Sequence, residues 1–142
     1  MALNVLVVDD SAVMRRMIVK TLELCGVPVG ELHQAANGAE GLKVLQEHWV
    51  DLVLVDINMP VMNGEKMIER LRENAETRDT AVIVVSTDGS AARAEMLERQ
   101  RAGFVHKPFT PEILRDAILR TTGASYDQLV GKPTLSSDGP DF

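Results

Sequence analysis

Several side chains capable of chemistry stand directly after short runs of β-branched residues. Asp9 and Asp10 follow Val5-Leu6-Val7-Val8, Asp56 follows Leu52-Val53-Leu54-Val55, Ser86 follows Val82-Ile83-Val84-Val85, and Lys107 comes just after Phe104-Val105. If these runs are buried parallel strands, their carboxyl ends share one edge of a sheet, which is where open α/β folds bind ligands. Three carboxylates, a hydroxyl and an ammonium would then converge on one pocket. This set of groups is suited to handling a phosphoryl group together with a divalent cation.

The elements that must position these groups alternate between strand and helix patterns five times. The expected strands are Leu3–Val8, Glu31–Ala36, Asp51–Asp56, Ala81–Val85 and Gly103–His106. The expected helices run from Ser11 to about Cys25, from Asn37-Gly38 onward, over Gly64–Asn74, over about Ser90–Arg101, and from the Thr110-Pro111-Glu112 start onward. Five βα units with right-handed crossovers predict an α/β fold, a doubly wound three-layer sandwich with helices on both faces of a parallel sheet.

Helical spacing also predicts which side chains of these helices are buried. In the first helix these are Met14, Met17, Ile18, Leu22 and Cys25, and in the last Ile113, Leu114, Ala117 and Ile118. The helix near Ser90–Arg101 is polar, with Met96 and Leu97 as its large apolar residues, so we expect weak packing on the core. Trp49 is expected to pack at a helix end.

The bulk composition excludes several classes of protein. The chain has 142 residues and a formal net charge of −6, with a pI near 5.0. Clustered Lys and Arg are lacking, so we expect no nucleic-acid binding. No apolar run approaches the ~20 residues of a membrane span, and the start does not resemble a signal peptide. We therefore expect a cytoplasmic protein that does not insert into membranes, with its single cysteine, Cys25, as a small buried apolar residue.

The strand and helix pattern stops at Gly123. The stretch Ala124–Phe142 mixes Gly, Ser, Pro and Asp with isolated apolar residues. It is predicted to be a flexible C-terminal tail or linker, which leaves residues 1–123 as one domain.

The ordered set of motifs resembles the receiver domain of two-component response regulators, most closely the single-domain chemotaxis type. The motifs are Asp9-Asp10, the run Asp56-Ile57-Asn58-Met59-Pro60 that leads to Asn63-Gly64, Ser86-Thr87 and Lys107-Pro108-Phe109. The match covers roughly residues 3 to 122. It implies a flavodoxin-like five-stranded parallel sheet with strand order 2-1-3-4-5, and a module that phosphorylation activates.

The resemblance assigns the phosphoacceptor and the metal ligands. Asp56 would accept the phosphoryl group. Asp10, Asp56 and the backbone carbonyl of Asn58 would bind Mg²⁺ directly, and Asp9 would bind it through water. Taken alone, Asp9 and Asp10 would be read as turn and helix-start residues, and Asp56 as a turn residue.

The resemblance also assigns the residues around the phosphoryl group. Lys107 would contact a phosphoryl oxygen, and in the family the bond from this lysine to the following proline is cis. Ser86, preferred over Thr87, would donate its hydroxyl and act with Phe104 as the switch pair. Asn58 and Asp88 hold positions that tune hydrolysis of the aspartyl phosphate. The ordinary alternatives are a solvated lysine, a local turn bond for Ser86, a core Phe104, and loop solvation of Asn58 and Asp88.

The expected partners follow from the same resemblance. A histidine kinase, a phosphotransfer protein or a small phosphodonor would phosphorylate Asp56, and the protein would assist its own phosphorylation and dephosphorylation without being a true enzyme. A downstream protein would bind the face made by the helix near Ser90–Arg101, the strand Gly103–His106 and the last helix.

Other functions fit the residues less well. A haloacid-dehalogenase-type phosphohydrolase also uses a strand-end Asp, Mg²⁺ and Lys, but it needs a second Asp where this chain has Asn58. A dinucleotide-binding domain lacks its G-x-G-x-x-G after the first strand. A receiver cut from a longer regulator is a further alternative. The three histidines, His33, His48 and His106, are scattered along the chain without ligand spacing, so metal binding by them is not expected.

Overall fold

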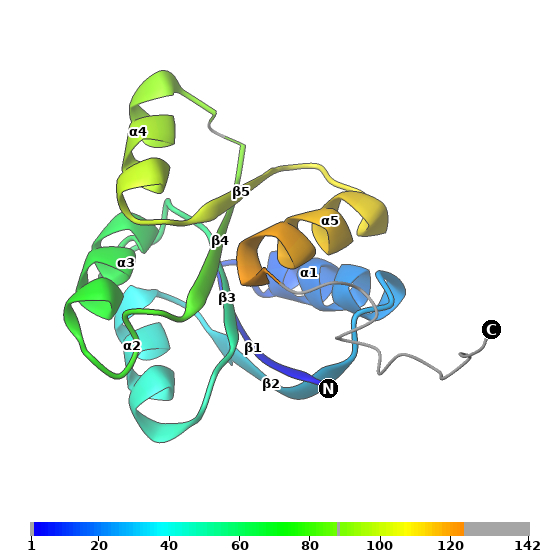
Figure 1. Ribbon diagram of the computed structural model, residues 1–142, viewed down its shortest axis with the longest axis horizontal. Helices are drawn as coiled ribbons and strands as arrows, with labels where there is room; N and C mark the ends of the chain where they lie inside the picture. Colours follow the sequence, from blue (N-terminus) through cyan, green and yellow to red (C-terminus); the bar gives the residue numbers. More distant parts are fainter. Residues whose placement is uncertain (1, 88, 124–142) are drawn as a thin grey trace.

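The computed structural model describes residues 2–87 and 89–123, which form five successive βα units (Figure 1). The strands are β1 (Leu3–Val8), β2 (Val29–Ala35), β3 (Leu52–Val55), β4 (Ala81–Ser86) and β5 (Gly103–His106). The helices are α1 (Ala12–Leu24), α2 (Gly38–Glu47), α3 (Gly64–Glu73), α4 (Ala91–Arg99) and α5 (Pro111–Thr122). Asp88 and the predicted tail, 124–142, lie outside the described residues.

All five strands are parallel and lie in the order β2-β1-β3-β4-β5, which confirms the predicted fold class. β1 and β3 are neighbours with Val8 beside Val55, so the residues that follow them leave the sheet side by side. The strand order reverses between these two strands, which is the usual ligand-binding crevice of such sheets.

The two faces of the sheet bury separate aliphatic clusters. α1 and α5 cover one face, and α2, α3 and α4 lie on the other (Figure 1). Alternate residues of each strand point to opposite faces; in β3, Leu54 packs with the α1 and α5 side, and Val53 and Val55 pack with the α2 and α3 side. Burial on both faces explains why β3 reads as a continuous apolar run.

Polar caps fix where the helices begin. The side chains of Ser11, Asn37, Asn63 and Thr110 each accept a hydrogen bond from a backbone N–H of the first turn. A cap of this kind satisfies one of the amide groups that a helix start leaves unpaired. Ser11 and Thr110 stand at the predicted starts of their helices, and α1 and α5 accordingly begin directly after them.

Several element boundaries differ from the prediction by one or two residues, most clearly at β2 and α4. β2 begins at Val29, before the expected Glu31, because Leu3 already pairs with Val29 and donates to the carbonyl of Pro28. α4 is shorter than expected at its carboxyl end. The backbone turns at Arg101, with φ 56°, and Ala102 N–H donates to the Leu97 carbonyl.

Three predicted packing residues are instead exposed: Met17, Ile113 and Trp49. Met17 and Ile113 lie at the margins of the apolar stripes of α1 and α5, where helical spacing does not decide which side chain the neighbouring element covers. Trp49 is 72% exposed, and its indole N–H donates to Asp51 Oδ1 over 3.0 Å, so one hydrogen bond holds the ring at the surface.

Cys25 is buried as predicted. None of the helices in the described part of the chain combines the length and apolar character that crossing a membrane requires.

Candidate functional site

Asp56 stands immediately beyond the buried strand β3. Its backbone N–H donates to the Val8 carbonyl over 2.9 Å, which continues the pairing with β1 past the end of the strand. Its carboxylate oxygen Oδ1 accepts from the Ile57 N–H at 2.8 Å. The side chain is 14% exposed, so it is reachable from solvent while its backbone is fixed by the sheet.

The loop after Asp56 depends on Gly64, a residue whose packing role sequence reasoning missed. Gly64 N–H donates to the Ile57 carbonyl over 2.9 Å and thereby closes the loop. A Cβ atom at this position would overlap the Asp56 carbonyl oxygen. Glycine is therefore required for the start of α3 to approach the backbone that carries Asp56.

The acidic pair at the end of β1 divides into a buried and an exposed member. Asp9 is 1% exposed, and its Oδ1 accepts from the Ser11 N–H at 2.9 Å, whereas Asp10 is exposed. Arg15, which sequence reasoning did not single out, donates from Nη1 to the Asp9 carbonyl over 2.6 Å. Carboxylate oxygens of Asp9, Asp10 and Asp56 all lie within 4.8 Å of one another.

Lys107 supplies the positive charge of this cluster. Its Nζ lies 3.3 Å from Asp9 Oδ2 and 3.9 Å from Asp56 Oδ1, and its side chain is 13% exposed. Its backbone N–H donates to the Ser86 carbonyl over 2.9 Å, which ties the end of β5 to the end of β4. The Lys107–Pro108 peptide bond is cis, as the resemblance implied.

The electrostatics of Asp56 reflect this crowding. Burial raises the pKa of the Asp56 carboxyl above its usual value, and the neighbouring Asp9 carboxylate raises it further. The Lys107 ammonium opposes both effects, as do the backbone N–H groups of Ile57 and Asn58. A partly desolvated cluster of carboxylates favours a bound cation, and an all-oxygen donor set suits Mg²⁺. The residues present therefore fit the expected metal.

Of the other predicted site residues, the structure describes Ser86, Phe104 and Asn58. Ser86 ends β4, the neighbour of β3, and is 1% exposed, whereas Thr87 is exposed. Phe104 is half-buried against the cluster that includes Met96, with its ring 6.2 Å from that of His106 in an edge-on arrangement. Asn58 is exposed, and Asp88 lies outside the described residues.

The histidines correct the sequence-based view that they are scattered. His33 and His48 lie together, with stacked rings 4.2 Å between centroids. Helix α2 packs against strand β2, and this contact brings the two residues together although 15 positions separate them in the sequence. His106 lies elsewhere, on β5.

The doubly wound parallel sheet and the acidic pocket with its lysine define a class: an α/β protein that handles phosphoryl groups at the carboxyl edge of its sheet. Residues 5–119 match the family model of the response regulator receiver domain, and the chain therefore belongs to that family.

Named relatives agree with this assignment. The chain is 34% identical over 120 residues to a chemotaxis protein CheY homolog of Campylobacter jejuni, covering 82% of this chain and 89% of the relative. It is 33% identical to chemotaxis protein CheY1 of Helicobacter pylori over 82% of this chain and 94% of that protein. Among solved structures, CheY4 of Vibrio cholerae superposes with a TM-score of 0.76 at 32% identity, covering 85% of this chain and 99% of that one.

A further structural neighbour shows the same fold at lower identity. It is the receiver domain of the sensor histidine kinase PA1611 from Pseudomonas aeruginosa, with a TM-score of 0.75, 20% identity, and coverage of 87% of this chain and all of that one. That structure is described as having magnesium coordinated in its active site cleft.

Family membership establishes the coarse function. The chain is a phosphorylation-dependent signalling module, and receiver domains act as phosphoacceptors that bind Mg²⁺ at their acidic site and interact with histidine kinases and downstream effectors. The phosphohydrolase alternative is not favoured, and the exposed residue two positions after Asp56 is Asn58 rather than the acid that chemistry requires.

Proposed function

We propose that Asp56 is the phosphoacceptor of this receiver domain. The observation that carries the proposal is the position of Lys107 Nζ, which lies within 4 Å of both the buried Asp9 and the solvent-reachable Asp56. Of the carboxylates in the pocket, Asp56 has its backbone held directly after β3 by the Val8 carbonyl, and its side chain is reachable from solvent. Asp9 is buried and paired, which suits a supporting role.

The proposed step is a phosphoryl transfer. A carboxylate oxygen of Asp56 forms a bond to phosphorus. The bond that breaks is P–N in a phosphohistidine donor or P–O in acetyl phosphate, and its electron pair leaves with the imidazole or with acetate. Lys107 is placed to offset negative charge on the phosphoryl oxygens. The hydroxyl of Ser86, at the end of the neighbouring strand, is the second proposed donor.

Asp10, Asp56 and the Asn58 backbone carbonyl would hold Mg²⁺, with Asp9 acting through water. When bound, Mg²⁺ would screen the repulsion between the anionic donor and the carboxylates. Asn58 and Asp88 are proposed to tune the later hydrolysis of the aspartyl phosphate, because they hold the sequence positions that have this role in the family. We assign this chemistry to residues 1–123, with 124–142 as tail or linker.

The signal is proposed to leave through the face formed by α4, β5 and α5. Ser86 is buried at the end of β4, and half-buried Phe104 lies on the next strand beneath the polar helix α4. Movement of the Ser86 hydroxyl toward a phosphoryl group would leave space that the Phe104 ring can fill, and α4 would shift with it. The partner would be a downstream protein, and the phosphodonor a histidine kinase or phosphotransfer protein.

Amide chemical shifts with and without beryllofluoride test the switch. Large shifts are expected at the amides of Ser86, Gly103 and Phe104 in addition to those at Asp9, Asp10 and Asp56. If the shifts stay at the acidic pocket and leave residues 86–87 and 89–106 unchanged, the switch proposal is wrong.

Intact-mass spectrometry tests the phosphoacceptor. Acetyl phosphate with Mg²⁺ should add about 80 Da, the mass of one phosphoryl group, to the parent chain but not to Asp56→Asn. Asp79→Asn is the matched control, because Asp79 is exposed and forms an ion pair with Arg101. An adduct that persists in Asp56→Asn would refute the assignment.

A further inference from the structure

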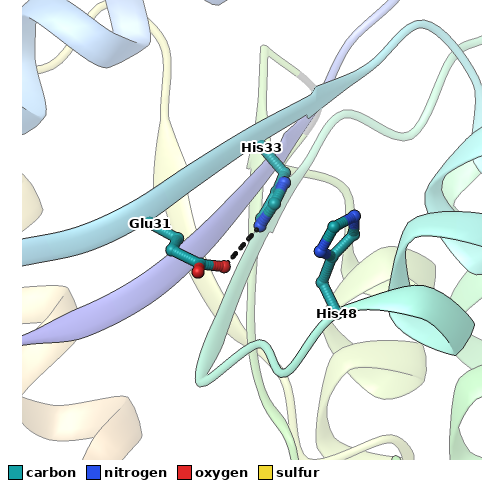
Figure 2. Close-up of side chains that lie close together, drawn as sticks. All are labelled: Glu31, His33 and His48. Carbon is teal, nitrogen blue, oxygen red and sulfur yellow. Dashed lines mark hydrogen bonds and ion pairs between the residues drawn. The ribbon is translucent and has the colours of Figure 1, made fainter.

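A second group of potential metal ligands lies away from the acidic pocket. Glu31, His33 and His48 converge in Figure 2, with the first two on strand β2 and His48 at the end of helix α2. One ligand atom from each lies within 4.8 Å of the others. His48 precedes β3 and Asp56 follows it, so these two residues lie at opposite ends of that strand.

Local structure holds two of these side chains on one face of β2. Glu31 and His33 are two residues apart in the strand, a spacing that places them on the same face. The register with β1 shifts between Leu3 and Val5, and the Glu31 N–H bonds to the Asn4 side-chain oxygen at 2.8 Å in place of a ladder partner. This bulge sets the side of the strand to which Glu31 turns.

The third side chain comes from the element that covers this face. His48 is the C-cap of α2, and its backbone N–H donates to the Val44 carbonyl over 2.9 Å. Its ring stacks on that of His33 at 4.2 Å between centroids. His33 Nε2 lies 3.1 Å from Glu31 Oε1, so the three side chains already form one contact group.

We propose that Glu31, His33 and His48 bind one borderline transition-metal ion, with Zn²⁺ as the representative. Two imidazoles and one carboxylate, with water as a fourth ligand, are a donor set that Zn²⁺ takes and that Mg²⁺ does not prefer. Tetrahedral Zn²⁺ holds its donor atoms roughly 3.3 Å apart. The ligand atoms now lie within 4.8 Å of one another, and Glu31 and His48 are exposed, which leaves their side chains room to adjust. Bound metal would link the edge strand β2 to the end of α2.

Calorimetry on the full chain in excess Mg²⁺, which occupies the acidic pocket, is the primary test. One Zn²⁺ per chain is expected to bind. His33→Gln and His48→Gln should each weaken binding at least about tenfold, because loss even of groups that only orient a ligand costs 10–100-fold. His106→Gln is the matched control, since it removes the remaining histidine from a distant strand, and Asp10→Asn controls for zinc in the acidic pocket. Both should bind like the parent.

The chain carries a built-in reporter for a second readout that needs no variant. Trp49 is the single tryptophan, it is exposed, and it directly follows His48. Co²⁺ bound in place of Zn²⁺ should therefore quench the fluorescence of Trp49, and added Zn²⁺ should reverse the quenching. Absence of binding, binding retained by both histidine variants, binding lost in Asp10→Asn, or two chains sharing one ion would each overturn the proposal.

Discussion

Replacing Lys107 with methionine should leave the acidic pocket with uncompensated charge. The ammonium lies 3.3 Å from Asp9 and 3.9 Å from Asp56. At an effective dielectric constant near 20, these separations correspond to attractions of about 5 and about 4 kcal/mol. Desolvation of the three groups offsets much of this, so the relevant quantity is the cost of leaving buried carboxylates without their partner.

Breaking a buried ion pair by removing one member costs about 3–5 kcal/mol. Because Asp56 and Lys107 retain some exposure, we expect Lys107→Met to lower the free energy of unfolding by about 3 kcal/mol in EDTA, toward the low end of that range. Mg²⁺ should recover part of the loss, since a cation that binds only the folded state stabilises it by mass action. Methionine keeps the apolar length of the side chain, so the change isolates the charge.

Urea unfolding with and without Mg²⁺ measures both quantities. Lys66→Met is the matched control, because Lys66 makes an exposed pair with Glu69 at 3.7 Å, and surface pairs contribute about 0–1 kcal/mol. A loss in Lys107→Met no larger than that in Lys66→Met, or a loss that Mg²⁺ leaves unchanged, would refute the electrostatic account of the pocket.

Three further outcomes are expected. Gly64→Ala should destabilise the domain by at least about 2 kcal/mol and slow phosphorylation, because the added methyl meets the Asp56 carbonyl. Gly89→Ala is the control and should change little, because a Cβ there would meet only the His106 ring at 3.8 Å. Equal urea midpoints for the two variants would contradict the packing argument. Burial raises the pKa of the Cys25 thiol, so little thiolate forms near pH 8. Iodoacetamide should therefore label Cys25 only when the chain unfolds, and rapid labelling of the native chain would show that the thiol is accessible. Because the apolar residues of 124–142 lack a period, deleting that stretch should move the thermal midpoint by no more than a few degrees, and a larger drop would place it in the folded core.

The sheet and the acidic site were predictable because they depend on local signals. A β-branched run buried on both faces identifies β3 without reference to any other element, and a carboxylate at its end must lie at the shared edge. The caps Ser11 and Thr110 acted within one turn of their own helices. Each of these inferences needed only residues close in sequence and the rule that parallel strands share an edge.

The features that sequence reasoning missed depend on contacts between distant segments. The steric role of Gly64 is visible only when its neighbour, the Asp56 carbonyl, is known. Arg72 of α3 donates to the carbonyls of Gln100 and Thr80, over 2.8 and 2.6 Å, and so joins the α4–β5 connection to the α3–β4 connection, which no periodicity links. His33 and His48 meet for the same reason, since only the packing of α2 against β2 brings them together.

The position of the phosphoryl group on the chain tests the central claim most directly. Borohydride reduces an aspartyl phosphate to homoserine, so tandem mass spectrometry after reduction of the phosphorylated chain can identify the acceptor. Homoserine should appear at position 56 and require both phosphodonor and Mg²⁺. Homoserine at position 9 or 10, with Asp56 intact, would contradict the assignment of Asp56 as the phosphoacceptor.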